Sequence, residues 1–391
     1  MGGIYIKVLS LYDGMSCGQI ALRQLGVPVE EYYAYEIDKY AIKVTQHNFP
    51  DTIQCGDVFA ADFTKHRGVD TLIGGSPCTH WSICQHKDRE TTASGIGWDL
   101  FSQYVRALEE VQPQWFLYEN NKSMAPAIRQ QISETFGFEP ICINSALLSG
   151  QNRERLYWVG RRNASGAYDS VDVQQPQDRG ILLADVLDDI TSEKCYALKS
   201  LTEREMAYMV GDHGNYSDRW TYLQKPGAKD KACCITANIH RGVPYNICAQ
   251  PVRLGTIENS AKRQDFDSQQ YRVYSPAGKS VTLCGCGGGV GAKTGLYLTP
   301  VSDPSVVHPV DEVRDGKILF HDEWHPINLP DGYYVIRKLT VDECKRLQTV
   351  PDWYDMTCIS ASQAYKCLGN GWTVEVIMYL IASAMSNKEG L

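Results

Sequence analysis

Two short apolar segments, residues 71–73 and 115–118, each run directly into a side chain that could take part in chemistry. The first leads to Cys78 and the second to Glu119, and an amphipathic helix lies between them. A strand, a crossover helix and a second parallel strand would place both side chains next to each other at the carboxyl edge of one sheet. Open α/β sheets build their sites at that edge. A thiol beside a carboxylate there indicates covalent chemistry assisted by proton donation.

The rest of the N-terminal region alternates in the same way between strand-like and helix-like segments. Further strands and helices are expected at residues 7–11, 18–25, 32–36 and about 38–48, in a weak strand before Asp57, and in a helix after Asp99. This alternation predicts a doubly wound, Rossmann-like α/β fold with a mainly parallel sheet.

The alternation stops after about residue 162 and returns near the end of the chain. Thr340 and Glu343 form a capping-box pattern, and an apolar helix is expected at about residues 374–385. We therefore expect residues 1–165 and 335–391 to form one domain. Residues 166–334 are expected to form a smaller, irregular and β-rich domain.

The composition excludes several classes of protein. No apolar run in the 391 residues approaches the ~20 residues that cross a bilayer, and the N-terminus lacks the apolar core of a secretory signal, so a cytoplasmic location is expected. The net charge of −8 argues against a general nucleic-acid coat but allows a local basic face. The close pairs Cys233-Cys234 and Cys284-Gly285-Cys286 lack the spacing of zinc sites, so no metal is expected.

Polar residues follow each of the first three strand-like segments. The first leads into a glycine-containing turn, Tyr12-Asp13-Gly14, that would let a ligand lie against backbone N–H groups. It lacks the G-x-G-x-x-G pattern, so a dinucleotide is not favoured. Glu36 ends the second segment, where a carboxylate commonly binds ribose hydroxyls, and Asp57 ends the third, where it could accept from an adenine amino group. Each alone is more often a cap or turn residue, but their succession favours a nucleoside site.

Two further features bear on the chemistry. Residues 79–98 are polar and contain Gly95 and Gly97, which is typical of a mobile lid. Arg153 and Arg155 alternate along a predicted strand and so share one face. There they would offer fixed positive charge to a developing anion or to phosphate. The alternatives are a cysteine used only for packing and arginines on a solvated edge.

Taken together and in order, these segments resemble the DNA (cytosine-5) methyltransferase family of bacteria and phages, with some similarity to the eukaryotic de novo branch. The matching residues are Tyr12-Asp13-Gly14, Gly18, Glu36, Asp57, Ser76-Pro77-Cys78, Glu119-Asn120, Gln151, Arg153, Arg155, Arg337-Lys338-Leu339-Thr340, Arg346-Leu347-Gln348 and Gly369-Asn370-Gly371-Trp372. The resemblance implies a class I S-adenosylmethionine-dependent fold with a mixed sheet. It also implies methyl transfer from S-adenosylmethionine to C5 of a cytosine flipped out of double-stranded DNA.

The resemblance assigns a role to each group of residues. Cys78 would attack cytosine C6, Glu119 would bond N3, Arg155 would hold the O2 edge and Arg153 would steady the site. Cofactor binding would fall to Tyr12, Asp13, Gly14, Ser16, Cys17, Gly18, Glu36, Ile37, Asp57, Val58, Pro77, Asn370, Gly371 and Trp372. Substrate and DNA binding would fall to Ser76, Thr79, Ser82, Gln85, Asn120, Gln151, Arg272, Gly287 and Gly288. Residues 166–334, where basic and aromatic residues interleave, would be the target-recognition domain.

Three residues depart from the family pattern: Thr79, Asn121 and Gly371. The first two leave open an altered pocket, an unusual base or a modified cofactor. Two other functions stay open, an RNA methyltransferase of the same fold and a DNA-binding protein without catalysis. A monomer is expected, with a restriction endonuclease acting on the same DNA site as a candidate partner. The biological role could be restriction-modification, solitary methylation or self-protection of phage DNA.

Overall fold

The computed structural model describes residues 5–82, 89–188, 273–274, 280–281, 296–300, 311–320, 322–326 and 331–386. The predictions for Gln85, Arg272, Gly287, Gly288 and the two cysteine pairs lie outside these described residues.

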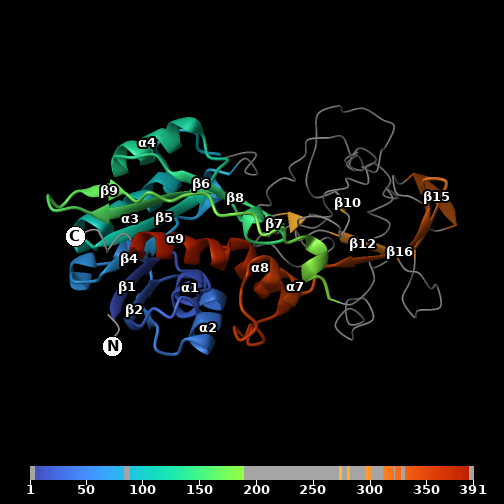
Figure 1. Ribbon diagram of the computed structural model, residues 1–391, viewed down its shortest axis with the longest axis horizontal. Helices are drawn as coiled ribbons and strands as arrows, with labels where there is room; N and C mark the ends of the chain where they lie inside the picture. The colour runs from blue at the N-terminus through green and yellow to red at the C-terminus, as the bar shows by residue number, and fades with distance from the viewer. Residues whose placement is uncertain are drawn as a thin grey trace.

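A mixed sheet of eight strands organises the N-terminal half (Figure 1), in the order β3-β2-β1-β4-β5-β8-β6 with β9 paired to β8. The strands are β1 (Ile6–Leu11), β2 (Val29–Tyr35), β3 (Ile53–Gln54), β4 (Thr71–Gly74), β5 (Trp115–Asn121), β6 (Ile141–Asn144), β8 (Glu154–Arg162) and β9 (Tyr168–Ser170). The pairs among β3, β2, β1, β4 and β5 are parallel, whereas β8 runs antiparallel to β5, β6 and β9. The predicted fold class, a doubly wound mixed sheet, is confirmed.

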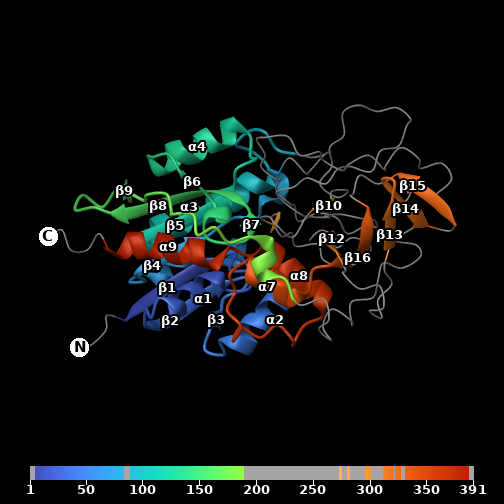
Figure 2. The same ribbon diagram turned by 45° about the vertical axis from the view of Figure 1, so that its right-hand side comes forward.

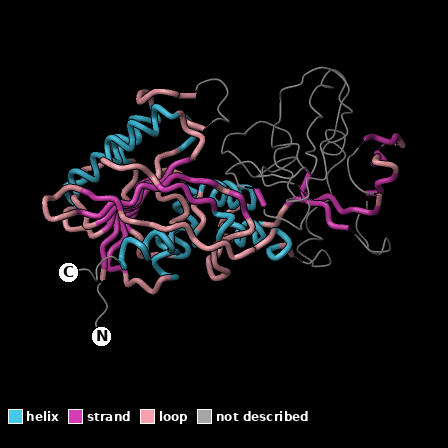
Figure 3. The backbone as a smooth tube through the Cα atoms, turned by 45° about the horizontal axis from the view of Figure 1, so that its top comes forward, coloured by secondary structure: helices cyan, strands magenta, loops and turns pink. Residues whose placement is uncertain are grey.

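Helices lie on both sides of this sheet (Figure 3) and bury two separate cores against it. One core includes α1 (Cys17–Gln24), α2 (Lys39–Asn48) and α9 (Val374–Ser386), and the other includes α3 (Ile96–Val111) and α4 (Pro126–Phe136). Successive strand residues alternate between the two cores. Ile73 and Leu117 enter the first, whereas Leu72 and Phe116 enter the second. Burial on both faces explains why these strands read as unbroken apolar runs.

The C-terminal helices return to the N-terminal half of the chain. α9 packs against α1, and α8 (Ala361–Asn370) lies near α2, as the adjacent red and blue ribbons show (Figure 2). α7 (Val341–Leu347) begins with the predicted capping box, which is confirmed. The Thr340 hydroxyl accepts from the Glu343 N–H at 2.9 Å, and the Glu343 carboxylate accepts from the Thr340 N–H at 2.7 Å.

A second sheet has six strands in the order β10-β12-β16-β13-β14-β15. They are β10 (Val273–Tyr274), β12 (Leu296–Pro300), β13 (Asp311–Arg314), β14 (Lys317–Phe320), β15 (Glu323–Pro326) and β16 (Gly332–Lys338). A separate two-stranded pairing joins β11 (Ser280–Val281) to β7 (Gln151–Asn152). The predicted domain limits, at residues 165 and 335, stay a prediction. β9 and the short helix η5 (Leu183–Val186) follow residue 165 but pack on the unit that contains the main sheet. β16 spans the second predicted limit.

Two local predictions differ from the structure. α3 begins at Ile96, before Asp99, because the Glu90 carboxylate accepts from the Gly97 N–H at 3.2 and 3.1 Å and so caps the helix. The third strand ends at Gln54, and Asp57 instead caps the short helix η1 (Val58–Ala60). Within the described ranges, no helix is long and apolar enough to cross a membrane.

Candidate active site

A cavity of about 630 Å³ opens along the carboxyl edge of the main sheet. Five segments at that edge contribute Tyr12 after β1, Glu36 after β2, Asp57 beyond β3, Cys78 after β4 and Glu119 on β5. The volume is within the range that small ligands occupy. The structure therefore brings the predicted thiol and carboxylate together in one cavity, as the strand–helix–strand pattern indicated.

Most of the residues predicted for the site line this cavity. Those that do so are Tyr12, Gly14, Glu36, Ile37, Asp57, Val58, Ser76, Pro77, Cys78, Thr79, Ser82, Glu119, Arg153, Arg155, Asn370 and Trp372. The predicted residues that do not are Asp13, Ser16, Cys17, Gly18, Asn120, Gln151 and Gly371.

The half-buried Cys78 begins the short helix η3 (Cys78–His80), directly after its N-cap residue Pro77. The residue before Pro77 is held by the neighbouring strand β5. Asn120 donates from Nδ2 to the Ser76 carbonyl at 3.2 Å, and the Tyr118 hydroxyl lies 2.6 Å from Ser76 Oγ. Asn120 thus acts beneath the cavity, where it fixes the segment that carries the thiol.

Among the described residues, Arg155 and Trp372 hold the Glu119 carboxylate, and Glu119 is only 9% exposed. Arg155 Nε lies 3.1 Å from Oε1, and Trp372 Nε1 donates to Oε2 at 3.0 Å. Contacts to opposite oxygens restrict rotation of the carboxylate, and the ion pair is largely buried.

Arg153 lines the same cavity as Arg155, as the predicted alternation required, but it has different partners. Its Nη2 donates to the carbonyls of Gly369 at 3.2 Å and Gly371 at 2.9 Å. Arg153 therefore ties the strand region to the loop that follows α8.

The other end of the cavity combines carboxylates with exposed apolar side chains. The Glu36 carboxylate accepts 2.8 Å hydrogen bonds from the N–H groups of Gly14, Ile37 and Asp38, which joins the turns after β1 and β2. Ile37 is 74% exposed and Phe59 is 53% exposed, and both line the cavity. Large apolar side chains exposed in a cavity wall offer a surface for a flat ring.

Three of the predicted residues that miss the cavity build the turn behind it. The Asp13 carboxylate accepts from the hydroxyls of Ser10 at 2.6 Å, Tyr32 at 2.8 Å, and Ser16. Burial raises the pKa of this carboxyl to about 6, against the opposing effect of those hydrogen bonds. Burial also raises the pKa of the Cys17 thiol to about 12, which makes it a packing residue.

Gly18 and Gln151 are also structural. A Cβ on Gly18 would come within 2.2 Å of Ile73 Cδ1, so glycine allows α1 to pack on β4. Gln151 is completely buried, and its Nε2 donates at 3.0 Å to both the Leu347 carbonyl and Gln348 Oε1. The DNA contact predicted at Gln151 stays a prediction, and in the structure Gln151 supports the neighbouring loop without lining the cavity.

Several cavity residues were not predicted from the sequence. They are Met15, Tyr35, Phe59, Gly75, Leu100, Asn152, Glu154, Lys366, Cys367 and Gly369, among others. The sequence did offer a signal for Leu100, since this residue lies on the predicted amphipathic helix. In the structure its carbonyl accepts from the Tyr12 hydroxyl at 2.6 Å. Asn152 and Glu154 flank Arg153, and no motif distinguishes them from Gln151.

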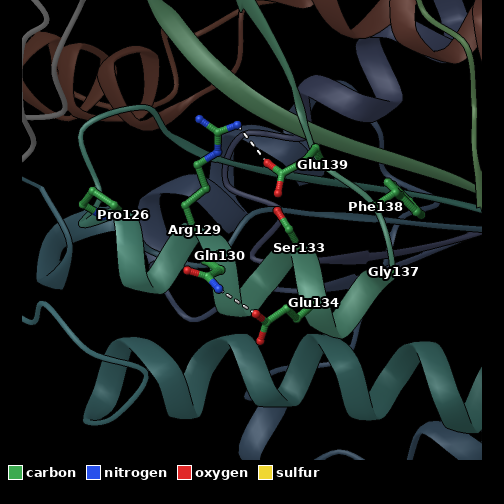
Figure 4. A pocket seen from close by; sticks show the side chains of 8 residues that line it. All are labelled: Pro126, Arg129, Gln130, Ser133, Glu134, Gly137, Phe138 and Glu139. Atoms are coloured by element: carbon green, nitrogen blue, oxygen red, sulfur yellow. Dashed lines mark hydrogen bonds and ion pairs between the residues drawn. The ribbon is translucent and has the colours of Figure 1, made fainter.

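A second hollow, of about 690 Å³, lies along α4 and the loop after it (Figure 4). Its polar side chains pair with each other, Arg129 with Glu139 at 2.9 Å and Gln130 with Glu134 at 2.8 Å. None of the residues predicted for chemistry lines it. The candidate active site is therefore the cavity that contains Cys78.

Comparison with known proteins identifies the family of the chain. The C-5 cytosine-specific DNA methylase family matches residues 6–386, which include every element of the site. The chain belongs to this family. The resemblance found in the sequence is therefore confirmed.

Two members of the family illustrate how similar the chain is to known proteins. The orphan methyltransferase M.Rho11sI of Bacillus phage rho11s is 28% identical over 359 residues, which cover 84% of this chain and 65% of the phage protein. This chain thus matches less than two thirds of that relative's length. The type II methyltransferase M.HhaI of Haemophilus parahaemolyticus is 25% identical over 397 residues, or 98% of this chain and 96% of that protein.

The solved structure of S. pombe Dnmt2 methyltransferase matches with a TM-score of 0.57 and 12% identity, covering 98% of this chain and 99% of the other. At that identity the match shows a shared fold.

Proposed function

We propose that this methylase transfers a methyl group from S-adenosylmethionine to C5 of a cytosine in double-stranded DNA. One observation carries the proposal. A single cavity has the Cys78 thiol and the Glu119 carboxylate at one end, and Glu36, Ile37 and Asp57 at the other. Such a cavity fits a reaction between a nucleobase and a nucleoside cofactor.

The residues of the second end fit S-adenosylmethionine. Three N–H donors leave the Glu36 carboxylate about one further acceptor site, enough for a ribose hydroxyl. Asp57 would accept from the adenine amino group, and Ile37 and Phe59 would contact the ring. When bound there, the cofactor would supply an electrophilic methyl group.

The protein's own groups would make the cytosine reactive. C5 of cytosine is a poor nucleophile until the Cys78 thiolate bonds to C6, which moves the electrons of the C5–C6 double bond toward C5. Glu119 would bond N3 and stabilise the protonated ring, and Arg155 would hold O2. C5 would take the methyl group and leave S-adenosylhomocysteine as the other product. C5 would then give its proton to a solvent base, the C5–C6 double bond would re-form, and the S–C6 bond would break to release the Cys78 thiolate. A cytosine in a duplex must flip out to reach this thiol.

The remaining parts of the proposal concern context. Residues 166–334 would read the DNA sequence, because they interleave basic and aromatic residues. We propose a cytoplasmic monomer that acts in restriction-modification, alone, or in protection of phage DNA. The name "orphan methyltransferase" of the Bacillus phage rho11s relative favours solitary action over a partner endonuclease.

The test compares Cys78→Ala with Cys358→Ala, another half-buried cysteine that does not line the cavity. Both proteins receive labelled S-adenosylmethionine with duplex DNA or with tRNA, and both are mixed with DNA containing 5-fluorocytosine. We expect Cys78→Ala to lose methyl transfer and the covalent complex while it still binds the cofactor in calorimetry, and Cys358→Ala to keep all three. Ordinary methylation by Cys78→Ala would refute the assigned nucleophile, and labelling of tRNA alone would favour the RNA alternative.

A further inference from the structure

The hydrogen bond between Trp372 and Glu119 joins residues 253 positions apart in the chain. The indole N–H donates to Glu119 Oε2 at 3.0 Å, whereas Arg155 Nε lies 3.1 Å from the other oxygen, Oε1. A carboxylate terminus turns easily, because its last torsion has broad minima. The contact from Arg155 Nε holds Oε1, and the indole adds a hold on Oε2.

The loop that carries Trp372 is itself rigidly supported. The Gly371 carbonyl accepts from Arg153 Nη2 at 2.9 Å and from Gln348 Nε2 at 3.2 Å. A Cβ on Gly371 would lie 3.0 Å from the Cys367 carbonyl oxygen, which leaves little room for this backbone to shift. The Trp372 indole therefore projects from a fixed point.

Gln348 is the centre of this support. Its Oε1 accepts from Gln151 Nε2 at 3.0 Å and from the Thr373 hydroxyl at 2.8 Å, and its Nε2 also donates to the Leu368 carbonyl at 2.6 Å. A continuous path of hydrogen bonds thus runs from Gln151 through Gln348 to the Trp372 loop. This path gives the buried Gln151 a structural role.

We infer that Trp372 is a positioning residue for Glu119, which it holds in the orientation that meets the cytosine ring. The inference rests on the proposed function and extends it. Arg153 and Gln151 act indirectly, because they fix the loop that carries the Trp372 indole. The indole N–H is uncharged and contributes one hydrogen bond to Glu119. Its loss should therefore slow the methyl-transfer step without changing the affinity for the cofactor.

The experiment replaces Trp372 by Phe, which keeps an aromatic ring but removes the N–H and part of the ring volume; the control variant loses the same volume. The matched control is Trp353→Phe, since Trp353 also donates one indole hydrogen bond, to Gln24 Oε1 at 3.3 Å, and does not line the cavity. We expect Trp372→Phe to lower the single-turnover rate of methyl transfer to duplex DNA by about tenfold. The Kd for S-adenosylmethionine should stay within about twofold, and Trp353→Phe should match the wild type.

A second measurement distinguishes positioning of Glu119 from a general loosening of the site. In a Glu119→Ala background, Trp372→Phe should cost less than about twofold, because no carboxylate remains to be oriented. A wild-type rate for Trp372→Phe, or a rise in cofactor Kd equal to the loss in rate, would overturn the inference. Failure of the proposed function would look different, since the wild type and Trp353→Phe would then also lack transfer to DNA.

Discussion

Gly75 offers a sharp test of how closely the fold positions the carboxylate. A Cβ at this position would lie 2.8 Å from the Glu119 carbonyl oxygen and 2.8 Å from Glu119 Oε2. Gly74 is a matched control, because its Cβ would lie 2.6 Å from the Leu11 carbonyl oxygen and 3.0 Å from the Tyr104 ring, away from Glu119. Both substitutions crowd a backbone oxygen, but only one crowds the carboxylate.

The expected magnitudes follow from these distances. Each alanine should destabilise the protein by about 1–3 kcal/mol through overpacking, so both should lower the urea midpoint. Ordinary contact begins at 3.4 Å, so Gly75→Ala would displace Glu119 Oε2 by about 0.6 Å. Since a misplacement of ~1 Å can cost ~10²-fold in rate, Gly75→Ala should lose about tenfold in transfer rate beyond its control.

The assay is single-turnover methyl transfer to duplex DNA at a temperature where both variants are folded, together with urea denaturation. We expect similar urea midpoints for Gly74→Ala and Gly75→Ala but different rates. Equal rates for the two variants at equal stability would refute the claim that the Glu119 carboxylate is held in one critical place.

Two further predictions concern groups around the cavity. Burial raises the pKa of Asp13 from 3.8 to about 6, so between these values the folded state binds a proton that the unfolded state lacks. The wild type should therefore lose stability relative to Asp13→Asn as the pH rises through this interval. Urea midpoints of both proteins, measured below and above the interval, would test this. A difference in midpoint that does not change with pH would contradict the burial argument. Glu90 accepts from Trp81 Nε1 at 3.0 Å and from the Gly97 N–H, so Glu90→Ala should speed proteolysis within residues 79–98 and slow methyl transfer. Glu110→Ala, which removes a carboxylate from the helix α3 outside the cavity, is the control, and equal cleavage of both variants would show that Glu90 does not hold the loop.

Much of the fold could be predicted because its signals are local. Residues 71–73 and 115–118 form strands buried on both faces, and such strands read as apolar runs whatever surrounds them. The capping box at Thr340 also depends only on residues within one turn. The start of α3 was harder to predict from the sequence, because the capping carboxylate of Glu90 comes from the preceding loop.

The site residues also differ in whether local patterns or distant contacts place them. Parallel strands must present their carboxyl ends at one edge, so the order of the segments alone was enough to place Cys78 and Glu119 together. Gln151 could not be assigned in this way, because its partner Gln348 is 197 positions away. Family motifs marked both kinds of residue alike, since a buried support and a cavity wall carry the same signal in sequence.

The sequence by itself determined which chemical groups this protein has and at which edge of the sheet they gather, because strand order and strand direction follow from local patterns and chain connectivity. Only the tertiary structure decided which of those groups face the cavity and which hold it in shape. Asp13 and Gln151 turned out to be supports, and Trp372 a partner of Glu119. The physical reason is that side-chain direction depends on hydrogen bonds and packing between segments that are far apart in the chain, and no local pattern encodes those contacts.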